Sequence, residues 1–314
     1  MSDVAQIYPN DRITLREVGL RDGLQLVKTW PDTDAKRGWL RREHAAGVRH
    51  FEIGSFLPAR HFPQFGDVQE MISAVAALSD AHSAALALNE RGLDDAMRTA
   101  VDEIVCVVSA TEEHSQANMR RSRDEAIGLV RKAVALRNAD APGKIVNAGI
   151  AMAFGCSISG HVDPDEVIRL SEACLAVGAD IVGLADTVGY AGPRQVGALS
   201  NAMAKLCGDR PFSIHLHDTR GMGIANAAAA IDNGARVLDA SLGGLGGCPF
   251  APGATGNVVF EDLVFLCETM GFATGIDLSR MKEARAIAEH SMPGEAFHGA
   301  LSKAGPPANM KWSA

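Results

Sequence analysis

Eight short apolar segments alternate with longer amphipathic segments along this chain, and this alternation constrains the fold more than any other feature. The apolar segments have the length of buried strands: Ile13–Val18, Val48–Ile53, Ser83–Leu88, Glu103–Val108, Ile145–Met152, Asp180–Leu184, Phe212–His217 and Val237–Ser241. The intervening segments have a helical pattern: Asp34–Ala46, Gln64–Leu78, Glu90–Thr99, Arg123–Asn138, Asp163–Val177, Arg194–Cys207, Ile224–Asn233 and Asn257–Met270. Alternating strands and helices predict a parallel sheet, and eight such units predict an α/β fold, a closed (β/α)8 TIM barrel.

The main alternative is an open, doubly wound sheet with helices on both faces. In its dinucleotide-binding form, that fold carries a Gly-x-Gly-x-x-Gly turn after the first strand. No such turn follows Ile13–Val18, which favours the barrel. The helix boundaries are also marked, because Gly47 and Gly178 stand at helix ends and Asp163 precedes a proline at a helix start.

The length of 314 residues lies within the range of one-domain barrels, so we expect residues 1–314 to form a single catalytic domain. Residues 291–314 are rich in Pro, Gly and Ala, which predicts a short, irregular C-terminal extension. The segment Leu242–Gly256 holds six glycines and two prolines and follows the eighth predicted strand. In a barrel this segment lies on the face where the chemistry occurs, so we interpret it as an active-site loop.

Composition excludes several classes of protein. Hydrophobic residues make up 47% and charged residues 22%, as in soluble globular domains, and the net charge of −8 argues against nucleic acid as the main partner. No apolar run of membrane-spanning length is present, and the N-terminus lacks the pattern of a signal peptide. None of the six cysteines lies in a Cys-x-x-Cys pair, which favours a reducing, cytoplasmic location over a disulfide framework.

Two histidines lie at the end of the seventh predicted strand. His215 and His217 are two residues apart, so both side chains point to the same side of the strand, toward the barrel mouth. Asp22 follows the first strand at the same end of the barrel and adds a carboxylate. These three residues predict a metal site, although two polar residues at a strand end without a metal remain the alternative.

Other polar residues follow the strands at this end. Arg21 precedes Asp22 and is placed to stabilise an oxyanion, with a solvated ion pair as the alternative. Glu52 ends an apolar strand, where an unpaired carboxylate would be costly, so it must be paired or reach the mouth. Asp186 follows the sixth strand and fits either a group that faces the mouth or a helix cap.

Two residues of the glycine-rich region complete the set of candidates. Asn257 is expected to begin the last predicted helix, either as a plain N-cap or as a further metal ligand. Cys248 lies between glycines and a proline and is either an inert thiol or a proton donor. A ligand set of Asp, His, His and Asn offers oxygen and nitrogen but no thiolate, which favours Mg²⁺ or Mn²⁺ over Zn²⁺ or Co²⁺.

These motifs together resemble the 3-hydroxy-3-methylglutaryl-CoA lyase family, within the metal-dependent TIM-barrel lyases and condensing enzymes. The resemblance covers about residues 12–290. The matching motifs are Glu17-Val18-Gly19-Leu20-Arg21-Asp22-Gly23-Leu24-Gln25, Glu52-Ile53-Gly54-Ser55-Phe56, Pro63-Gln64-Phe65-Gly66-Asp67, Ala185-Asp186-Thr187-Val188-Gly189, His215-Leu216-His217-Asp218-Thr219, and the segment from Gly243 to Asn257 with Glu261-Asp262-Leu263 after it. The Gly-Leu-Gly-Gly-Cys-Pro loop is more like the lyases than the synthases.

The resemblance implies roles for the matching positions. Four residues look like the metal shell: Asp22, His215, His217 and Asn257. Arg21 looks like the residue that stabilises an enolate, and Cys248 looks like the loop thiol that takes part in proton transfer. Glu52 and Asp186 match acidic residues of the family site, and Gln25 and Ser55 lie near it. The resemblance further implies a divalent cation as cofactor, an acyl-CoA substrate and a homo-oligomer, perhaps a dimer.

Several positions depart from the family pattern. Leu26-Val27 replaces the common Asn-Glu, and Asn147-Ala148-Gly149 replaces Arg-Gly-Tyr on the fifth strand. The loop after that strand reads Cys156-Ser157-Ile158-Ser159-Gly160 in place of Cys-Pro-Tyr-Glu-Gly, and Thr111-Glu112-Glu113-His114 replaces Ser-Glu-x-Phe. The loss of an aromatic side chain and a cation predicts a pocket that accepts a different acyl group.

The first hypothesis is therefore a metal-dependent carbon–carbon lyase. It would cleave a 3-hydroxy-3-methylglutaryl-CoA-like thioester to acetyl-CoA and a keto acid, acetoacetate by default. A lyase for another 3-hydroxyacyl-CoA, such as a larger branched analogue or citramalyl-CoA, is the close alternative. An acetyl-CoA-dependent condensing transferase and a non-catalytic CoA-ester-binding barrel are the others. Cys248 in its loop argues against the transferase, and the full set of polar residues argues against the non-catalytic barrel.

Overall fold

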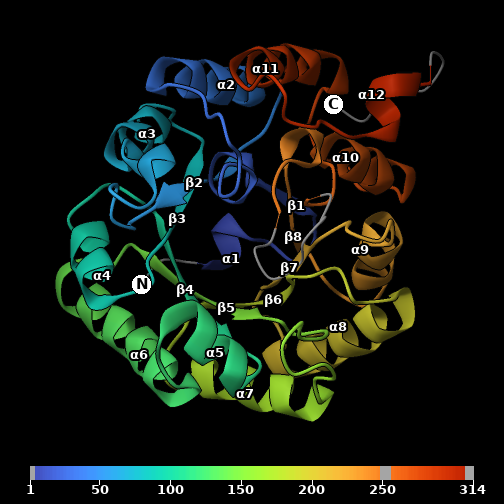
Figure 1. Cartoon of the computed structure of the whole chain (residues 1–314). Helices are drawn as coiled ribbons and strands as arrows, with labels where there is room; N and C mark the ends of the chain where they lie inside the picture. The colour runs from blue at the N-terminus through green and yellow to red at the C-terminus, as the bar shows by residue number, and fades with distance from the viewer. Residues whose placement is uncertain (1–3, 248–255, 308–314) are drawn as a thin grey trace.

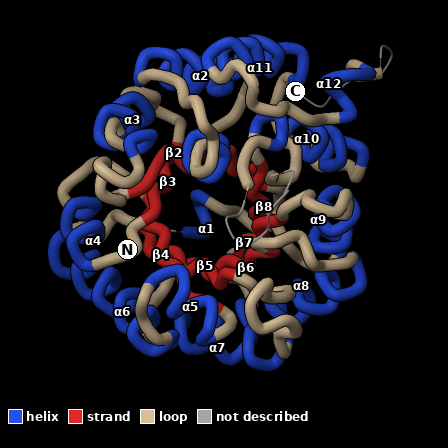
Figure 2. Tube along the Cα trace, in the orientation of Figure 1, coloured by secondary structure: helices blue, strands red, loops and turns tan. Residues whose placement is uncertain are grey.

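The computed structural model describes residues 4–247 and 256–307, and its centre is a closed barrel of parallel strands in the order β1 to β8. Figures 1 and 2 look along the axis of this ring, with the helices outside it. The strands are β1 (Thr14–Glu17), β2 (His50–Ser55), β3 (His82–Leu86), β4 (Glu103–Ser109), β5 (Ile145–Ala151), β6 (Ile181–Asp186), β7 (Phe212–Leu216) and β8 (Val237–Ala240). The pairing of Thr14–Glu17 with Val237–Ala240 closes the ring, which confirms the predicted (β/α)8 barrel.

The helices surround the strands. They are α1 (Val4–Ile7), α2 (Thr33–Ala45), α3 (Val68–Ala76), α4 (Glu90–Met97), α5 (Glu112–Met119), α6 (Arg123–Asp140), α7 (Pro164–Ala176), α8 (Pro193–Cys207), α9 (Gly223–Asp232), α10 (Phe260–Thr269), α11 (Leu278–Ser291) and α12 (Ala300–Ala304). Three short helical turns are η1 (Gly19–Gly23), η2 (Pro63–Phe65) and η3 (Leu242–Gly244). None of the helices in the described ranges combines the length and the apolar character that a bilayer span requires.

Local sequence signals explain where the longer helices begin. Ser122 and Glu125 form a capping box at the start of α6, with each side chain bonded to the backbone of the other residue. Asp32 caps α2 and accepts a hydrogen bond from the Ala35 amide. The inner faces of these helices and the outer faces of the strands form one large apolar core between the two rings.

The amino-terminal end of the barrel is closed by α1 and the residue after it. Tyr8 is buried against Ile145, Ile181 and Val237, which are the first residues of β5, β6 and β8. In Figure 1, α1 lies in the middle of the strand ring. The cavity that the described residues enclose therefore lies toward the carboxyl-terminal end of the strands, where the candidate residues were expected.

Three expectations need correction. Asn257 does not begin a helix, because it forms an isolated β-bridge with His217 and α10 starts only at Phe260. The extension at 291–314 is not wholly irregular, since Ala300–Ala304 is helical. Among the helices of eight or more residues, α5 and α11 were not predicted, and α11 packs beside α2 (Figure 1).

Candidate active site

Asp22, His215 and His217 meet at the open end of the barrel. Asp22 lies in the η1 turn after β1, His215 is in β7, and His217 follows that strand directly. One potential ligand atom from each residue lies within 4.8 Å of the others. Side chains more than 190 residues apart in sequence thus form one compact donor cluster, as the spacing of the strand ends predicted.

The contacts within this cluster fit a divalent cation. The Nε2 atoms of His215 and His217 lie 3.1 Å apart, and Asp22 Oδ2 lies 3.9 Å and 3.5 Å from them. Two imidazole nitrogens and a carboxylate oxygen that face one another in a buried site suit a shared cation. Burial opposes the charge of Asp22, but Arg21 and the histidines hold the pKa of this carboxyl well below its usual range. Asp22 is therefore available as an anionic ligand.

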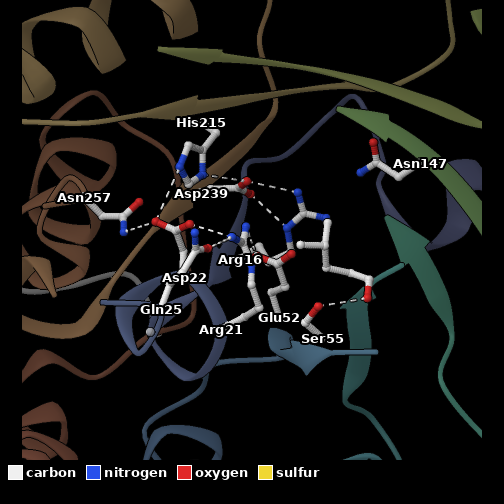
Figure 3. Close-up of polar contacts among 12 residues, drawn as sticks. Arg16, Arg21, Asp22, Gln25, Glu52, Ser55, Asn147, His215, Asp239 and Asn257 are labelled. Atoms are coloured by element: carbon white, nitrogen blue, oxygen red, sulfur yellow. Dashed lines mark hydrogen bonds and ion pairs between the residues drawn. The ribbon is translucent and has the colours of Figure 1, made fainter. Parts of the chain in front are cut away.

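Asn257 lies against the same carboxylate. Its Nδ2 donates to Asp22 Oδ2 at 2.8 Å (Figure 3) and also to the Leu245 carbonyl at 2.9 Å. Its buried Oδ1 has no hydrogen-bond partner among the described residues. An amide whose two N–H groups are engaged leaves its oxygen as the only atom for a further ligand. The geometry therefore supports the ligand interpretation of Asn257 better than the N-cap one.

Arg21 is fixed beside the cluster by two carboxylates. Its Nη1 donates to Asp22 Oδ1 at 2.5 Å, and its Nη2 contacts Glu52 Oε2 at 2.7 Å. Gln25 Oε1 accepts a longer bond of 3.3 Å from Nη1. Burial raises the pKa of Glu52, and the charge of Arg21 opposes that rise. A guanidinium held in this way at a barrel mouth can stabilise negative charge on a substrate oxygen without reorganising.

Behind the histidines lies a buried ion-pair network that the sequence reasoning missed. His215 Nδ1 donates to Asp239 Oδ2 at 3.2 Å, and Asp239 accepts two bonds from Arg16, at 2.8 Å and 3.1 Å (Figure 3). Arg16 also donates to Glu103 at 2.6 Å, and so does Asn147 at 2.7 Å. Asp239 thus orients the His215 ring. The sequence did contain a signal for this network. Arg16 lies within β1 and Asp239 lies within β8, and a charged residue in a buried strand needs a partner.

Two predicted substrate-binding residues lie apart from the cluster. Ser55 is fully buried and donates to the Leu86 carbonyl at 3.3 Å, within the barrel wall. Asp186 accepts hydrogen bonds from the amides of Tyr190 and Ala191 at 2.8 Å and 3.1 Å, so its carboxylate caps the turn after β6. Neither residue lines the cavity at the barrel mouth. Cys248 lies outside the described residues.

The mouth contains a cavity of about 320 Å³. Arg21, Asp22, Glu52, His215 and His217 line one side of it, together with Gln25. The lining also contains aliphatic side chains from β3, β4 and the residues just after β3, namely Leu86, Val105, Val107 and Leu88. This size is at the lower end of the range for small-molecule sites. The described lining therefore combines potential metal ligands and apolar side chains in one cavity.

Comparison with known proteins agrees with this geometry. The HMGL-like family matches residues 12–287. A hydroxymethylglutaryl-CoA lyase of Bacillus subtilis is 34% identical, over 91% of this chain and 94% of the relative. An (R)-citramalyl-CoA lyase of Chloroflexus aurantiacus is 35% identical, over 94% of this chain and 96% of the relative.

Solved structures give the same result. An HMG-CoA lyase from Acinetobacter baumannii, in complex with coenzyme A and 3-methylmalate, superposes with a TM-score of 0.88. It is 34% identical and covers 98% of this chain and 99% of its own. The family match spans nearly the whole barrel, including the strand ends that carry Asp22, His215 and His217. This chain therefore belongs to the HMGL-like family.

Proposed function

We propose that this protein is a metal-dependent carbon–carbon lyase. It cleaves a 3-hydroxyacyl-CoA of the 3-hydroxy-3-methylglutaryl-CoA type to acetyl-CoA and a keto acid, with acetoacetate as the default product. The observation that carries the proposal is the donor cluster of Asp22, His215 and His217 with Arg21 fixed beside it. The names of the similar lyases support the same reaction class.

The donor set matches a hard divalent cation. Asp22, His215, His217 and the amide oxygen of Asn257 would hold Mg²⁺ or Mn²⁺, because they provide oxygen and nitrogen but no sulfur. When bound, such a cation would act as a Lewis acid on the substrate hydroxyl and a neighbouring carboxyl or carbonyl oxygen. Asp239 would keep the proton of His215 on Nδ1, so that Nε2 faces the cluster with its lone pair.

The reaction requires charge to move from the hydroxyl to the thioester. The C3 hydroxyl loses its proton to a carboxylate at the site, and the C2–C3 bond breaks as C3 becomes a ketone. The bonding electrons pass to the thioester fragment, which leaves as an enolate. Arg21 faces the enolate oxygen, and Glu52 keeps the guanidinium in place through its 2.7 Å contact.

The enolate must then gain a proton at C2 to become acetyl-CoA. Cys248, which lies outside the described residues, is the proposed donor for this step. Gly246 and Gly247 precede it at the edge of the site, and Gly247 lines the cavity.

The remaining proposals concern substrate binding, cellular location and assembly. Gln25 lines the cavity and is proposed to contact the substrate, whereas Ser55 and Asp186 would act only through the walls that they stabilise. The five cysteines in the described ranges are free thiols, which suits a reducing cytoplasm. We further propose a single catalytic domain over residues 1–314 that assembles as a homo-oligomer, such as a dimer.

A second candidate is a citramalyl-CoA lyase, because a relative with that name is 35% identical over nearly the whole chain. The experiment that separates the candidates offers purified protein 3-hydroxy-3-methylglutaryl-CoA and citramalyl-CoA with Mg²⁺ or Mn²⁺ and a thiol reductant. Acetyl-CoA and the keto acid are measured for each. Acetyl-CoA with acetoacetate supports the first function, and acetyl-CoA with pyruvate supports the second. Release of free CoA from acetyl-CoA and a keto acid, with no thioester cleaved, would indicate a condensing transferase.

A further inference from the structure

We propose that the preferred substrate carries at C3 an uncharged alkyl substituent longer than methyl, which binds against an apolar wall on β3 and β4. This inference rests on the proposed lyase function and specifies the substrate of the same site. The wall consists of Leu86, Leu88, Val105 and Val107, which all line the cavity. We call these four residues the apolar wall.

The apolar wall is separate from the core that stabilises the fold. Its residues form an apolar cluster of their own inside the barrel, distinct from the large core between strands and helices. Val105 and Val107 are two residues apart in β4 and point to the same inner side of that strand, and Leu86 at the end of β3 and Leu88 just after it line the same cavity. Leu88 and Val107 are only partly buried. These side chains pack against one another and still line the cavity, so they offer a surface for an apolar ligand group.

The strand order places this wall opposite the metal donors. In the closed ring, β3 lies four strands from β7, which carries His215, and β4 lies three strands from β7 and three from β1, which Asp22 follows. The hydroxyl and carboxyl oxygens of the substrate would lie at the cluster of Asp22, His215 and His217. Two groups on C3 then remain to be placed, the thioester arm and one further substituent. The thioester arm must pass Arg21 and leave through the mouth. The remaining substituent of the tetrahedral C3 then points across the barrel, toward the apolar wall.

Small residues on the neighbouring strands leave room for that substituent. Gly149 and Ala151 of β5 line the cavity. A Cβ atom placed on Gly149 would have the Cys106 carbonyl, at 3.7 Å, as its one neighbour within 4 Å in the described structure, which is ordinary contact. Gly183 of β6 differs, because a Cβ there would come within 2.5 Å of Ser213 Oγ. The space beside Gly149 is thus open, and no tight packing in the described structure requires a glycine there.

The charges around the cavity also favour an uncharged substituent. Among the described residues that line it, the arginines are Arg16 and Arg21, and each is already paired with two carboxylates. Burial lowers the pKa of His114 to about 4, so this ring is neutral at physiological pH. A carboxylate directed at the apolar wall would lose its hydration without gaining a cation. An alkyl group gains from the same burial.

The test compares wild-type kcat/KM for 3-hydroxy-3-methylglutaryl-CoA and its 3-butyl analogue. Each fully buried methylene is worth about fourfold, so three extra methylenes favour the butyl compound by up to about 60-fold. Gly149→Leu fills the space beside the wall and should reverse the preference. Gly143→Leu is the matched control, because Gly143 lies in an exposed turn with nothing within 4 Å of its Cβ position. The control should keep the wild-type ratio. Ala151→Leu replaces Gly149→Leu if thermal unfolding shows that the latter does not fold.

The outcomes separate this inference from the function on which it rests. Cleavage of the methyl compound alone overturns the inference and leaves the lyase function intact. An equal loss for both compounds in Gly149→Leu also overturns it, since the wall would then contact the CoA arm that both share. If neither compound is cleaved and citramalyl-CoA is not cleaved either, the proposed function fails, and the inference fails with it.

Discussion

Asp239→Asn removes one charge from the network behind the metal donors and nearly preserves the shape of the side chain. In the native site, Asp239 Oδ1 accepts from Arg16 Nε, and Oδ2 accepts from both Arg16 Nη2 and His215 Nδ1. Asparagine supplies one oxygen, which the shortest contact, with Arg16 at 2.8 Å, should retain. The amide N–H₂ then faces His215 Nδ1, which becomes the acceptor. The ring proton moves to Nε2, the nitrogen that faces Asp22 and His217.

An Nε2 atom that carries a proton cannot bind a cation. The His215 proton must first return to Nδ1, and the free energy of this tautomer change weakens metal binding. Loss of such a supporting contact typically costs about 10- to 100-fold in metal affinity, or about 1.4 to 2.7 kcal/mol. The fold should persist, because Arg16 keeps its 2.6 Å contact with Glu103. We therefore expect weaker metal binding in a protein whose circular dichroism spectrum matches that of the wild type.

The assay is calorimetric titration of metal-free protein with Mn²⁺, with Asp218→Asn as the matched control. Asp218 lies next to His217, and its Oδ1 accepts from the Gly223 amide at 2.7 Å. The control makes the same change of charge near the site without altering the His215 contact, so its dissociation constant should stay within about threefold of the wild-type value. A folded Asp239→Asn variant with unchanged Mn²⁺ affinity would refute the orienting role of Asp239.

Three further perturbations probe other parts of the structure. Arg16→Leu leaves the carboxylates of Glu103 and Asp239 buried without their shared arginine, so urea unfolding should report a loss of about 3–5 kcal/mol; a loss below about 1 kcal/mol would contradict the ion-pair account. Arg21→Lys should lower kcat about 10²- to 10³-fold while Mn²⁺ affinity changes little, and a comparable loss of Mn²⁺ affinity would instead place Arg21 in metal binding. Burial raises the pKa of Glu17 from 4.5 to about 8, so the folded state keeps this proton longer than the unfolded chain, and stability falls as pH rises between these values. Glu17→Gln should therefore lose less stability than the wild type from pH 5 to 8, measured by urea unfolding, and parallel curves for the two proteins would contradict this reading.

Much of the fold could be predicted because each strand–helix unit carries its signal locally. The predicted and observed strands agree to within about two residues, as for Glu103–Ser109 and Ile145–Ala151. The helix α11 was missed although its buried residues have helical spacing, at Leu278, Met281, Ala284 and Ala288. The weak amphipathic contrast of this segment comes from alanines that pack closely against a neighbouring helix, and sequence alone does not reveal that neighbour.

The site was predictable where residues act through their position on a strand. Asp22, His215 and His217 could be placed at one end of the barrel because the carboxyl ends of parallel strands meet there. Arg16 and Asp239 could not be paired in advance, because they are 223 residues apart and become neighbours only when β1 and β8 close the ring. Asn257 was expected at a helix start, and only the bridge with His217 reveals its place beside Asp22.

We propose that thioester cleavage requires a metal held by Asp22, His215 and His217. The most direct measurement follows Mn²⁺ binding and acetyl-CoA release together, in wild-type protein and in His217→Gln, with the methyl and butyl thioesters and citramalyl-CoA as substrates. The account predicts that chelation of the metal stops turnover in the wild type, that added Mn²⁺ restores it, and that His217→Gln loses both tight Mn²⁺ binding and turnover. Undiminished cleavage in the presence of a chelator, or full activity of His217→Gln without tight Mn²⁺ binding, would contradict it.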